Sequence, residues 1–267
     1  MNLQRTGLLI ALCLTAFTAC DGRPSTGVNA AASASAAAAA STPANSQERV
    51  VVGTLGGMKV RIPWHFVNLM EFSGEPTDWK GGPKSPVSRP AGATRDIASF
   101  GFEVRYPDMA GLSTPALRSD HDQRPFKVNP WMDVTITSGD LYRPRALAAM
   151  ASAIREPLSD APYLKVESDV DTLERHVAQG VNPKTKQPAR LDLLNPDVYL
   201  AFEPPGQASA VIRCSNTEIG RQACVHAFVL EPQARVFVQV RYGRDMLPEW
   251  QDIQRRTRAL LLGFRID

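Results

Sequence analysis

The sequence predicts an α+β fold built on antiparallel β-sheet, and three observations lead to this expectation. Apolar and polar residues alternate over residues 58–62, 99–106 and 132–137, which gives each segment one apolar and one wet face, as in antiparallel sheets. The helical patterns stand apart from the runs of strands, whereas a doubly wound sheet would alternate them. The 267 residues are 43% hydrophobic and 21% charged, a globular composition that excludes disorder along the whole chain and a polytopic membrane protein.

The first strands are expected to form a hairpin. Residues 50–52 are valines, Gly56-Gly57 supplies a turn, and residues 58–62 then alternate between apolar and basic side chains. Two short strand patterns on either side of a Gly-Gly pair are typical of a tight β-hairpin.

The C-terminal third predicts a four-strand meander followed by an amphipathic helix. The strands are expected at residues 197–202, 208–213, 224–230 and 235–242, and their short connections favour a meander. Pro248 suits the first turn of the helix. The apolar stripe of this helix recurs at helical spacing and consists of Leu247, Trp250, Ile253, Thr257, Leu260 and Leu261.

Two further segments have helical spacing. Residues 144–155 place Leu147, Met150 and Ile154 on one face, which predicts a core-packed helix. Residues 170–179 show a weaker pattern of the same kind and are expected to form a third helix.

The charge balance does not predict nucleic-acid binding. The chain has 30 basic and 27 acidic side chains and a formal charge of +3, whereas nucleic-acid binding usually needs a concentrated basic face. Arg255, Arg256 and Arg258 lie off the apolar stripe of the C-terminal helix, so we interpret them as a solvated face.

The N-terminus predicts export and lipidation. Arg5 precedes an apolar run at residues 7–17, which is too short to span a bilayer and fits the apolar region of a signal peptide. The run ends at Phe17-Thr18-Ala19-Cys20, which resembles the bacterial lipobox, although that family prefers Leu at the position of Phe17. The resemblance implies that residues 1–19 are removed and that Cys20 receives a diacylglycerol anchor. The alternative is ordinary secretory cleavage nearby.

The segment that follows is expected to be a tether. Residues 30–41 contain only Ala and Ser, and an isolated helix of this length is marginal in water. We therefore interpret residues 20–48 as the lipidated cysteine with an Ala/Ser-rich spacer, and residues 49–267 as a single α+β domain. The expected location is the cell envelope, facing the periplasm, with the choice of inner or outer membrane open.

Two cysteines remain in the mature chain and predict a disulfide. Cys214 and Cys224 stand at the facing ends of two neighbouring predicted strands. An oxidising envelope favours a bond between them. A redox pair or metal ligands are the alternatives, but there is no C-x-x-C motif and no second pair of ligands nearby.

No motif predicts catalysis, a metal or a cofactor. The chain lacks a G-x-S-x-G elbow, an H-E-x-x-H motif and a Gly-rich phosphate loop after a strand. The histidines are scattered at His65, His121, His176 and His226. We therefore predict no enzyme, although a carboxylate site escapes any sequence pattern. Its candidate residues are Glu71, Glu75, Asp78, Asp108 and Asp120.

Two of the histidines have a specific expectation. The segment Asp120-His121-Asp122 is the densest cluster of potential ligands, and we interpret it as a solvated loop. His226 lies within a predicted strand and is expected on the sheet surface.

Long loops are the remaining unusual feature. The segments 73–95, 107–130 and 180–196 exceed the usual connection length, and such loops tend to be functional or disordered. The first two are predicted to bind a protein partner. Trp79 has the character of an interface anchor, and basic side chains near it suit an acidic partner surface. These basic side chains are Lys80, Lys84 and Arg89.

The order of segments over residues 53–110 resembles a group of proteobacterial lipoproteins. The segment 57–63 reads GMKVRIP, Glu71-Phe72 and a Gly/Pro/Lys loop follow, and residues 99–109 read SFGFEVRYPDM. These lipoproteins are encoded beside secreted antibacterial effectors, including lipases of the type VI secretion system, and act as immunity proteins. The resemblance implies a non-catalytic role in which the protein binds a toxin in the periplasm and blocks it.

Three functions are therefore expected in order. The first is a membrane-anchored periplasmic lipoprotein that neutralises a secreted effector. The second is an accessory or assembly factor of the cell envelope or of a secretion machine. The third is a hydrolase with an unrecognised carboxylate site.

Overall fold

A computed structural model describes residues 49–75, 94–125, 129–156, 162–192, 194–204, 206–216 and 222–267. Residues 47–267 form one compact unit. The strands are β1 (Val50–Leu55), β2 (Met58–Pro63), β3 (Asn68–Phe72), β4 (Asp96–Arg105), β5 (Ala110–Gly111), β6 (Trp131–Thr137), β7 (Tyr163–Val166), β8 (Glu174–Ala178), β9 (Asp197–Glu203), β10 (Gln207–Cys214), β11 (Ala223–Val229) and β12 (Phe237–Gly243). The α-helices are α1 (Pro115–Asp122), α2 (Ala146–Arg155) and α3 (Trp250–Leu262).

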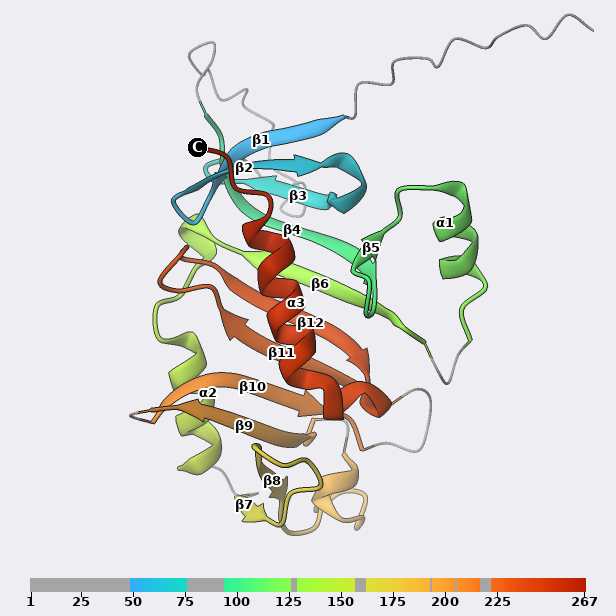
Figure 1. The fold of residues 1–267 in the computed structure, drawn as a ribbon. Helices are drawn as coiled ribbons and strands as arrows, with labels where there is room; N and C mark the ends of the chain where they lie inside the picture. The colour runs from blue at the N-terminus through green and yellow to red at the C-terminus, as the bar shows by residue number, and fades with distance from the viewer. Residues whose placement is uncertain are drawn as a thin grey trace, which may run out of the picture. The chain divides into compact units, whose positions relative to one another are not determined.

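The strands form one large and mostly antiparallel sheet, so the predicted α+β class is confirmed (Figure 1). The strand order is β2-β1-β4-β6-β12-β11-β10-β9-β8-β7, and β3 and β5 also pair with β4. The pairing of β1 with β4 is parallel. The lipidation residue Cys20, the signal peptide and the tether lie outside the described residues.

The predicted N-terminal hairpin is confirmed. Strands β1 and β2 pair in antiparallel register from Val50–Pro63 to Leu55–Met58. Gly56 adopts a φ of +57° in the turn, and a Cβ there would lie 2.5 Å from the carbonyl oxygen of Arg235. The backbone N–H of Arg235 donates to the Gly56 carbonyl at 3.0 Å. A glycine is needed here because the turn docks directly against the chain that leads into β12.

The four C-terminal strands form the predicted meander. Strands β9, β10, β11 and β12 are consecutive in both the chain and the sheet. Cys214 and Cys224 are register partners on β10 and β11 and form a disulfide. The bond therefore links two neighbouring strands beside the connection between them.

Helix α3 covers one face of the central strands, as its apolar stripe predicts (Figure 1). Trp250, Ile253, Thr257 and Leu261 are buried, and they pack with the inward-facing residues of β4, β6, β11 and β12. Pro248 lies in the 3₁₀ turn Arg244–Glu249, which precedes the α-helix.

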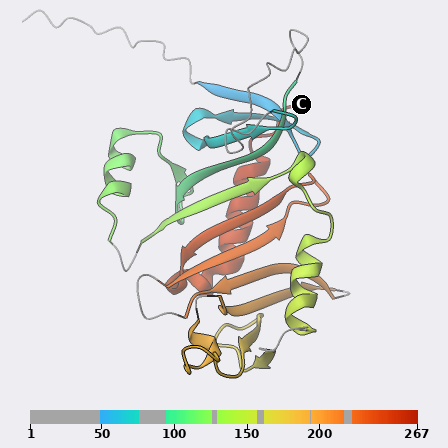
Figure 2. The same cartoon turned by 180° about the vertical axis from the view of Figure 1, so that it is seen from behind.

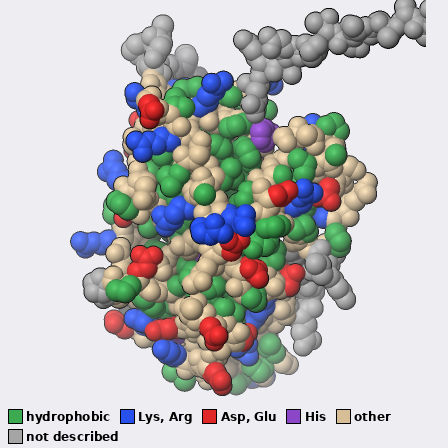
Figure 3. Space-filling model, in the orientation of Figure 1, with side chains coloured by type: hydrophobic (Ala, Val, Ile, Leu, Met, Phe, Trp, Pro, Cys, Tyr) green, Lys and Arg blue, Asp and Glu red, His purple; other side chains and the backbone are tan. Residues whose placement is uncertain are grey.

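The solvent side of α3 carries the predicted solvated face. Figure 3 shows basic side chains over the middle of this side of the molecule, where α3 lies in Figure 1. Arg255 is largely exposed, with 67% of its side chain accessible. Arg258 differs from the expectation because it is half-buried and its side chain donates to the carbonyl of Val229 at 2.8 Å.

Helix α2 covers part of the opposite face (Figure 2). It confirms the helix expected at residues 144–155 but begins at Ala146, after Arg145 in a left-handed conformation. Leu147 and Ala151 pack against a second apolar cluster on β9, β10 and β11. The two helices thus lie on opposite faces of one sheet.

The helix expected at residues 170–179 is wrong, because Glu174–Ala178 forms strand β8. This strand pairs antiparallel with β9, and its residues His176, Val177 and Ala178 are buried. Pairing with the edge of the meander satisfies the backbone of β8, which outweighs a weak local helical pattern.

A buried carboxylate ties three segments to the start of β9. Asp197 is fully buried and accepts hydrogen bonds from Arg175, Arg190, Arg244 and Asn216. Burial opposes ionisation, but the hydrogen bonds from Arg190, Arg175, Arg244 and Asn216 outweigh it and hold the pKa of Asp197 far below its ordinary value. The network is internally satisfied, so we assign it a structural role.

The expected position of His226 on the sheet surface is wrong. His226 points toward α3, is fully buried, and lies 2.9 Å from Gln254 of that helix and 3.3 Å from the hydroxyl of Tyr242. Burial lowers the pKa of His226 to about 4, and the hydrogen bond to Gln254 offsets only part of that effect. The alternation of the strand was read correctly, but only the packing of α3 shows which face is inside.

We expect the disulfide to stabilise the domain. Closing a loop of this length contributes about 3 kcal/mol in the chain-entropy model, which corresponds to a change in Tm of roughly 6–12 °C for a domain of this size. The double variant Cys214→Ser/Cys224→Ser should melt lower by this amount in thermal denaturation. A reducing agent should lower the Tm of the wild type and leave the variant unchanged. Equal melting of both proteins under oxidising conditions would contradict the expectation.

We expect acidification to destabilise the domain through His226. The folded-state pKa of about 4 lies below the unfolded value of about 6.5, so this stability is complete above pH 6.5 and is lost as the pH falls toward 4. The loss between pH 7 and pH 5 amounts to about 2 kcal/mol. In urea unfolding, His226→Gln should start from a lower stability at pH 7 and show a flatter pH dependence. Parallel pH curves for the two proteins would disprove this assignment.

Candidate functional site

The sheet has one face that no helix covers at its centre. Helix α2 packs over the β9–β11 end, whereas α1 stands beside β4 and β6, and the central strands between them are open (Figure 2). We call this surface the open face. Its members point away from α3 and are Ser99, Gly101 and Glu103 of β4, Asp133 and Thr135 of β6, Arg241 of β12, Val225 of β11 and Arg213 of β10.

A groove runs along the part of the open face formed by β4 and β6. One hollow of about 660 Å³ is lined by α1 and by the ends of β4, β6 and β12. A second hollow of about 330 Å³ lies between β3 and the same two strands. Glu103 and Asp133 line both hollows, so the two form one continuous groove.

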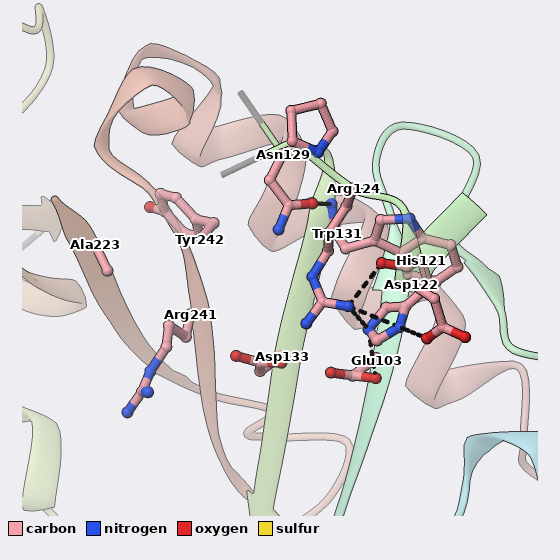
Figure 4. A pocket seen from close by; sticks show the side chains of 11 residues that line it. Glu103, His121, Asp122, Arg124, Asn129, Trp131, Asp133, Ala223, Arg241 and Tyr242 are labelled. Atoms are coloured by element: carbon pink, nitrogen blue, oxygen red, sulfur yellow. Dashed lines mark hydrogen bonds and ion pairs between the residues drawn. The ribbon is translucent and has the colours of Figure 1, made fainter. Parts of the chain in front are cut away.

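Two carboxylates meet on the floor of the groove. Glu103 and Asp133 are direct register partners on β4 and β6, and their side chains lie side by side (Figure 4). Burial and the neighbouring Glu103 raise the pKa of Asp133, although Arg241 and Arg124 oppose this shift. Like charges placed directly opposite on neighbouring strands are destabilising, so the pair is a local cost within the sheet.

The wall beside the pair is built by His121 and Trp131. His121 Nε2 lies 2.8 Å from the carboxylate of Glu103, and its ring stands perpendicular to that of Trp131 with 5.0 Å between the centroids. Arg124 contacts the His121 ring at 2.7 Å and donates to the His121 carbonyl at 2.8 Å (Figure 4). Glu103 therefore has a partner on its wall side, while Asp133 is exposed to the groove.

Helix α1 is held in place by polar contacts. None of its residues is buried. Asp120 accepts hydrogen bonds from Arg105 at 3.2 Å and from the indole of Trp131 at 3.1 Å, which fastens the helix beside β4 and β6. The side chain of Thr114 accepts from the backbone of Leu117 at 3.2 Å, with Pro115 at the first helical position.

The interpretation of Asp120-His121-Asp122 as a solvated loop is therefore wrong. The three residues end a helix, and His121 and Asp122 line the groove while Asp120 fastens the helix. A helix start was visible in the sequence, because Thr114 followed by Pro115 is a typical N-terminal cap.

The opposite rim of the groove carries an exposed leucine. Leu69 of β3 is 80% exposed and has a φ of +52°, a conformation that non-glycine residues rarely adopt. It lies where the pairing of β3 with β4 is irregular, between Asn68 and Glu71. The hydroxyl of Ser99 donates to Glu71 at 2.7 Å and closes this end of the groove.

The carboxylates suggested for a hydrolytic site do not converge. Ser99 donates to Glu71, Arg95 pairs with Glu75 at 2.5 Å, Arg105 pairs with Asp108 at 2.6 Å, and Asp120 fastens α1. Asp78 lies outside the described residues. The pair that does meet, Glu103 and Asp133, was not among them, because their adjacency depends on strand register.

Two negative findings concern the described part of the chain. It contains no group of three or more His, Cys, Asp or Glu residues arranged to hold a metal ion. None of its helices is long and apolar enough to cross a membrane.

The partner-binding residues expected in the first loop, Trp79, Lys80, Lys84 and Arg89, lie outside the described residues. The described ends of the two candidate binding segments can be placed. Ser73 bonds to Asp96 at the start of β4, whereas Pro107 follows the end of β4. A ten-residue strand separates these ends by about 30 Å. The groove lies between them, so a partner that touches both segments would cross it.

Comparisons with known proteins agree at the level of the fold. No family model matches the chain, and no curated protein matches its sequence. A large, mostly antiparallel sheet with a similar arrangement occurs in a solved structure of a secretion-system protein. That structure is Smlt3025, an immunity protein of the Stenotrophomonas maltophilia type IV secretion system. The TM-score is 0.51 at 16% identity, and the match covers 82% of this chain and 94% of that chain.

We expect the carboxylate pair to cost stability at neutral pH. Because the pKa of Asp133 is raised in the folded state, its ionisation destabilises the fold at pH 7, and this cost disappears as the residue is protonated at lower pH. Asp133→Asn should therefore raise the free energy of unfolding at pH 7 by about 0.2–1 kcal/mol, with a smaller gain at pH 4. Urea unfolding at the two pH values measures the effect.

Asp140→Asn is the matched control, because Asp140 is exposed and lies outside the strands. It should leave the stability unchanged. Destabilisation of Asp133→Asn at pH 7 would show that Arg241 and Arg124 outweigh Glu103.

Proposed function

We propose that this protein is an immunity protein of the cell envelope, which binds a secreted antibacterial effector and blocks its activity. The observation that carries the proposal is the likeness in fold to an immunity protein over most of both chains. The segment order at residues 53–110 points to the same class independently. The sequence resemblance suggests a type VI effector of the lipase kind, whereas the similar structure belongs to a type IV system.

The proposed location is outside the cytoplasm. The disulfide between Cys214 and Cys224 supports this location, since disulfides persist in oxidising compartments. In our proposal residues 1–19 are a signal peptide, Cys20 carries the lipid, and residues 21–48 are the tether. A tethered domain is concentrated near the membrane, where an incoming toxin that attacks lipids must act.

The proposed mode of action is occlusion and not catalysis. An inhibitor needs a complementary surface with a few anchors, and no reactive group is required. The groove, with the exposed Leu69 on its rim, supplies such a surface among the described residues. In our proposal the segments 73–95 and 107–130 extend it, with Trp79 as an anchor and nearby basic side chains meeting acidic groups of the effector.

Genetic and biochemical experiments together test the function. Deleting the gene should make cells sensitive to a sibling strain that delivers the effector encoded beside it, and a plasmid copy should restore survival. The purified domain should co-elute with that effector in size-exclusion chromatography. Complementation with Cys20→Ser, which lacks the lipid acceptor, should protect less well.

Full survival of the deletion strain, together with no co-elution, would rule out the immunity function. An envelope defect in unchallenged cells would instead identify an accessory factor of envelope or secretion-machine assembly. Hydrolysis of a substrate by the purified domain would point to an enzyme.

A further inference from the structure

Four charged residues stand in a single row across the open face. Glu103 of β4 opposes Asp133 of β6, and Asp133 in turn opposes Arg241 of β12. Arg241 opposes Val225 of β11, which opposes Arg213 of β10. We call these residues the charge row. With neighbouring strands about 4.8 Å apart, the row is about 19 Å long and changes from acidic to basic along its length.

The charge row is available for contact. Asp133, Arg241 and Arg213 are exposed, whereas their neighbours along each strand are buried on the α3 side. Within the described residues, no ion pair of 4 Å or less holds Asp133, Arg241 or Arg213. These three charges therefore do not stabilise the fold through a partner in the chain, unlike the buried network around Asp197.

The arrangement at the acidic end also lacks a structural reason. A sheet gains nothing from two carboxylates placed directly opposite each other, and a single Asn or Thr would remove the repulsion. A cation from another molecule would change this balance, since it would face Glu103 and Asp133 together. The hollow of about 660 Å³ beside the pair is large enough to receive a long basic side chain.

We propose that the charge row is the docking site of the effector and that it selects a protein surface with the reversed order of charges. A Lys or Arg side chain of the effector enters the groove at Glu103 and Asp133, and an acidic group of the effector meets Arg241 and Arg213. This inference rests on the proposed immunity function and specifies the chemistry of its partner. Charge complementarity of this kind fixes orientation, because the opposite alignment would bring like charges together.

The two-signed row favours a protein over other partners. A nucleic acid or an anionic bilayer presents negative charge along its whole surface and would be repelled by Glu103 and Asp133. A folded protein can present both signs within about 19 Å, the span of the row across four strand spacings.

An order-reversing variant tests the proposal. Asp133→Arg/Arg241→Asp exchanges the two central charges, so the net charge, the composition and the attraction between positions 133 and 241 are all preserved. Binding to the effector identified by co-elution is measured by surface plasmon resonance with the tethered full-length protein. We expect at least a 30-fold weaker affinity for the exchange variant. The association rate of the wild type should fall with added salt, and that of the variant should fall less.

Two controls separate docking from folding. Arg255→Glu reverses an exposed charge on α3, on the other side of the sheet, and should bind within about twofold of the wild type, as distant surface changes usually do. Arg213→Glu alters one exposed position at the basic end and tests the row without touching the carboxylate pair. Thermal melting establishes that each variant is folded, and Arg213→Glu replaces the exchange variant if the latter does not fold.

The outcomes are distinct. If the wild type binds the effector and the folded row variants bind equally well, the charge row is not the docking site, while the immunity function stands. If the wild type does not bind the effector, the immunity function fails and this inference fails with it. Weaker binding of the row variants, with Arg255→Glu unaffected, supports the proposal.

Discussion

The packing of α3 across the central strands is the constraint on which the rest of the structure depends. Strand residues alternate between two faces, so burying one face under a helix sends every second side chain to the other face. In β4, β6 and β12 the buried set is apolar, and it meets Trp250, Ile253 and Leu261 of α3. The remaining set is free to be chosen for a purpose other than folding. This division creates the open face, and the groove follows from it.

The open face carries features that are unfavourable for stability. Glu103 and Asp133 repel each other across two strands, and Leu69 is exposed in a left-handed conformation on the groove rim. Such local costs are typical of functional surfaces, because the surrounding fold holds them in place. The buried ion network at Asp197 and the disulfide at Cys214–Cys224 lie toward the meander and stabilise the scaffold itself.

A surface that works by contact explains the absence of recognisable chemistry. Within the described residues the candidate catalytic carboxylates are each engaged in local hydrogen bonds or ion pairs. An immunity protein needs its partner's active site to be covered and does not need one of its own. Its specificity would then be a matter of charge order and shape, which can diverge with the effector while the sheet and α3 stay in place. A fold shared at 16% identity is consistent with this view.

The sequence by itself determined the α+β class, the hairpin at β1–β2, the C-terminal meander, the stripe of α3 and the disulfide. These features depend on local periodicity or on neighbouring segments, where the physical signal is contained in a few consecutive residues. The tertiary structure alone decided the rest. It made residues 174–178 a strand by pairing them with β9, and it buried His226 under α3. It also brought Asp133 opposite Glu103, 30 positions earlier in the chain. Register and the choice of buried face arise from contacts between distant segments, so no pattern within one segment encodes them.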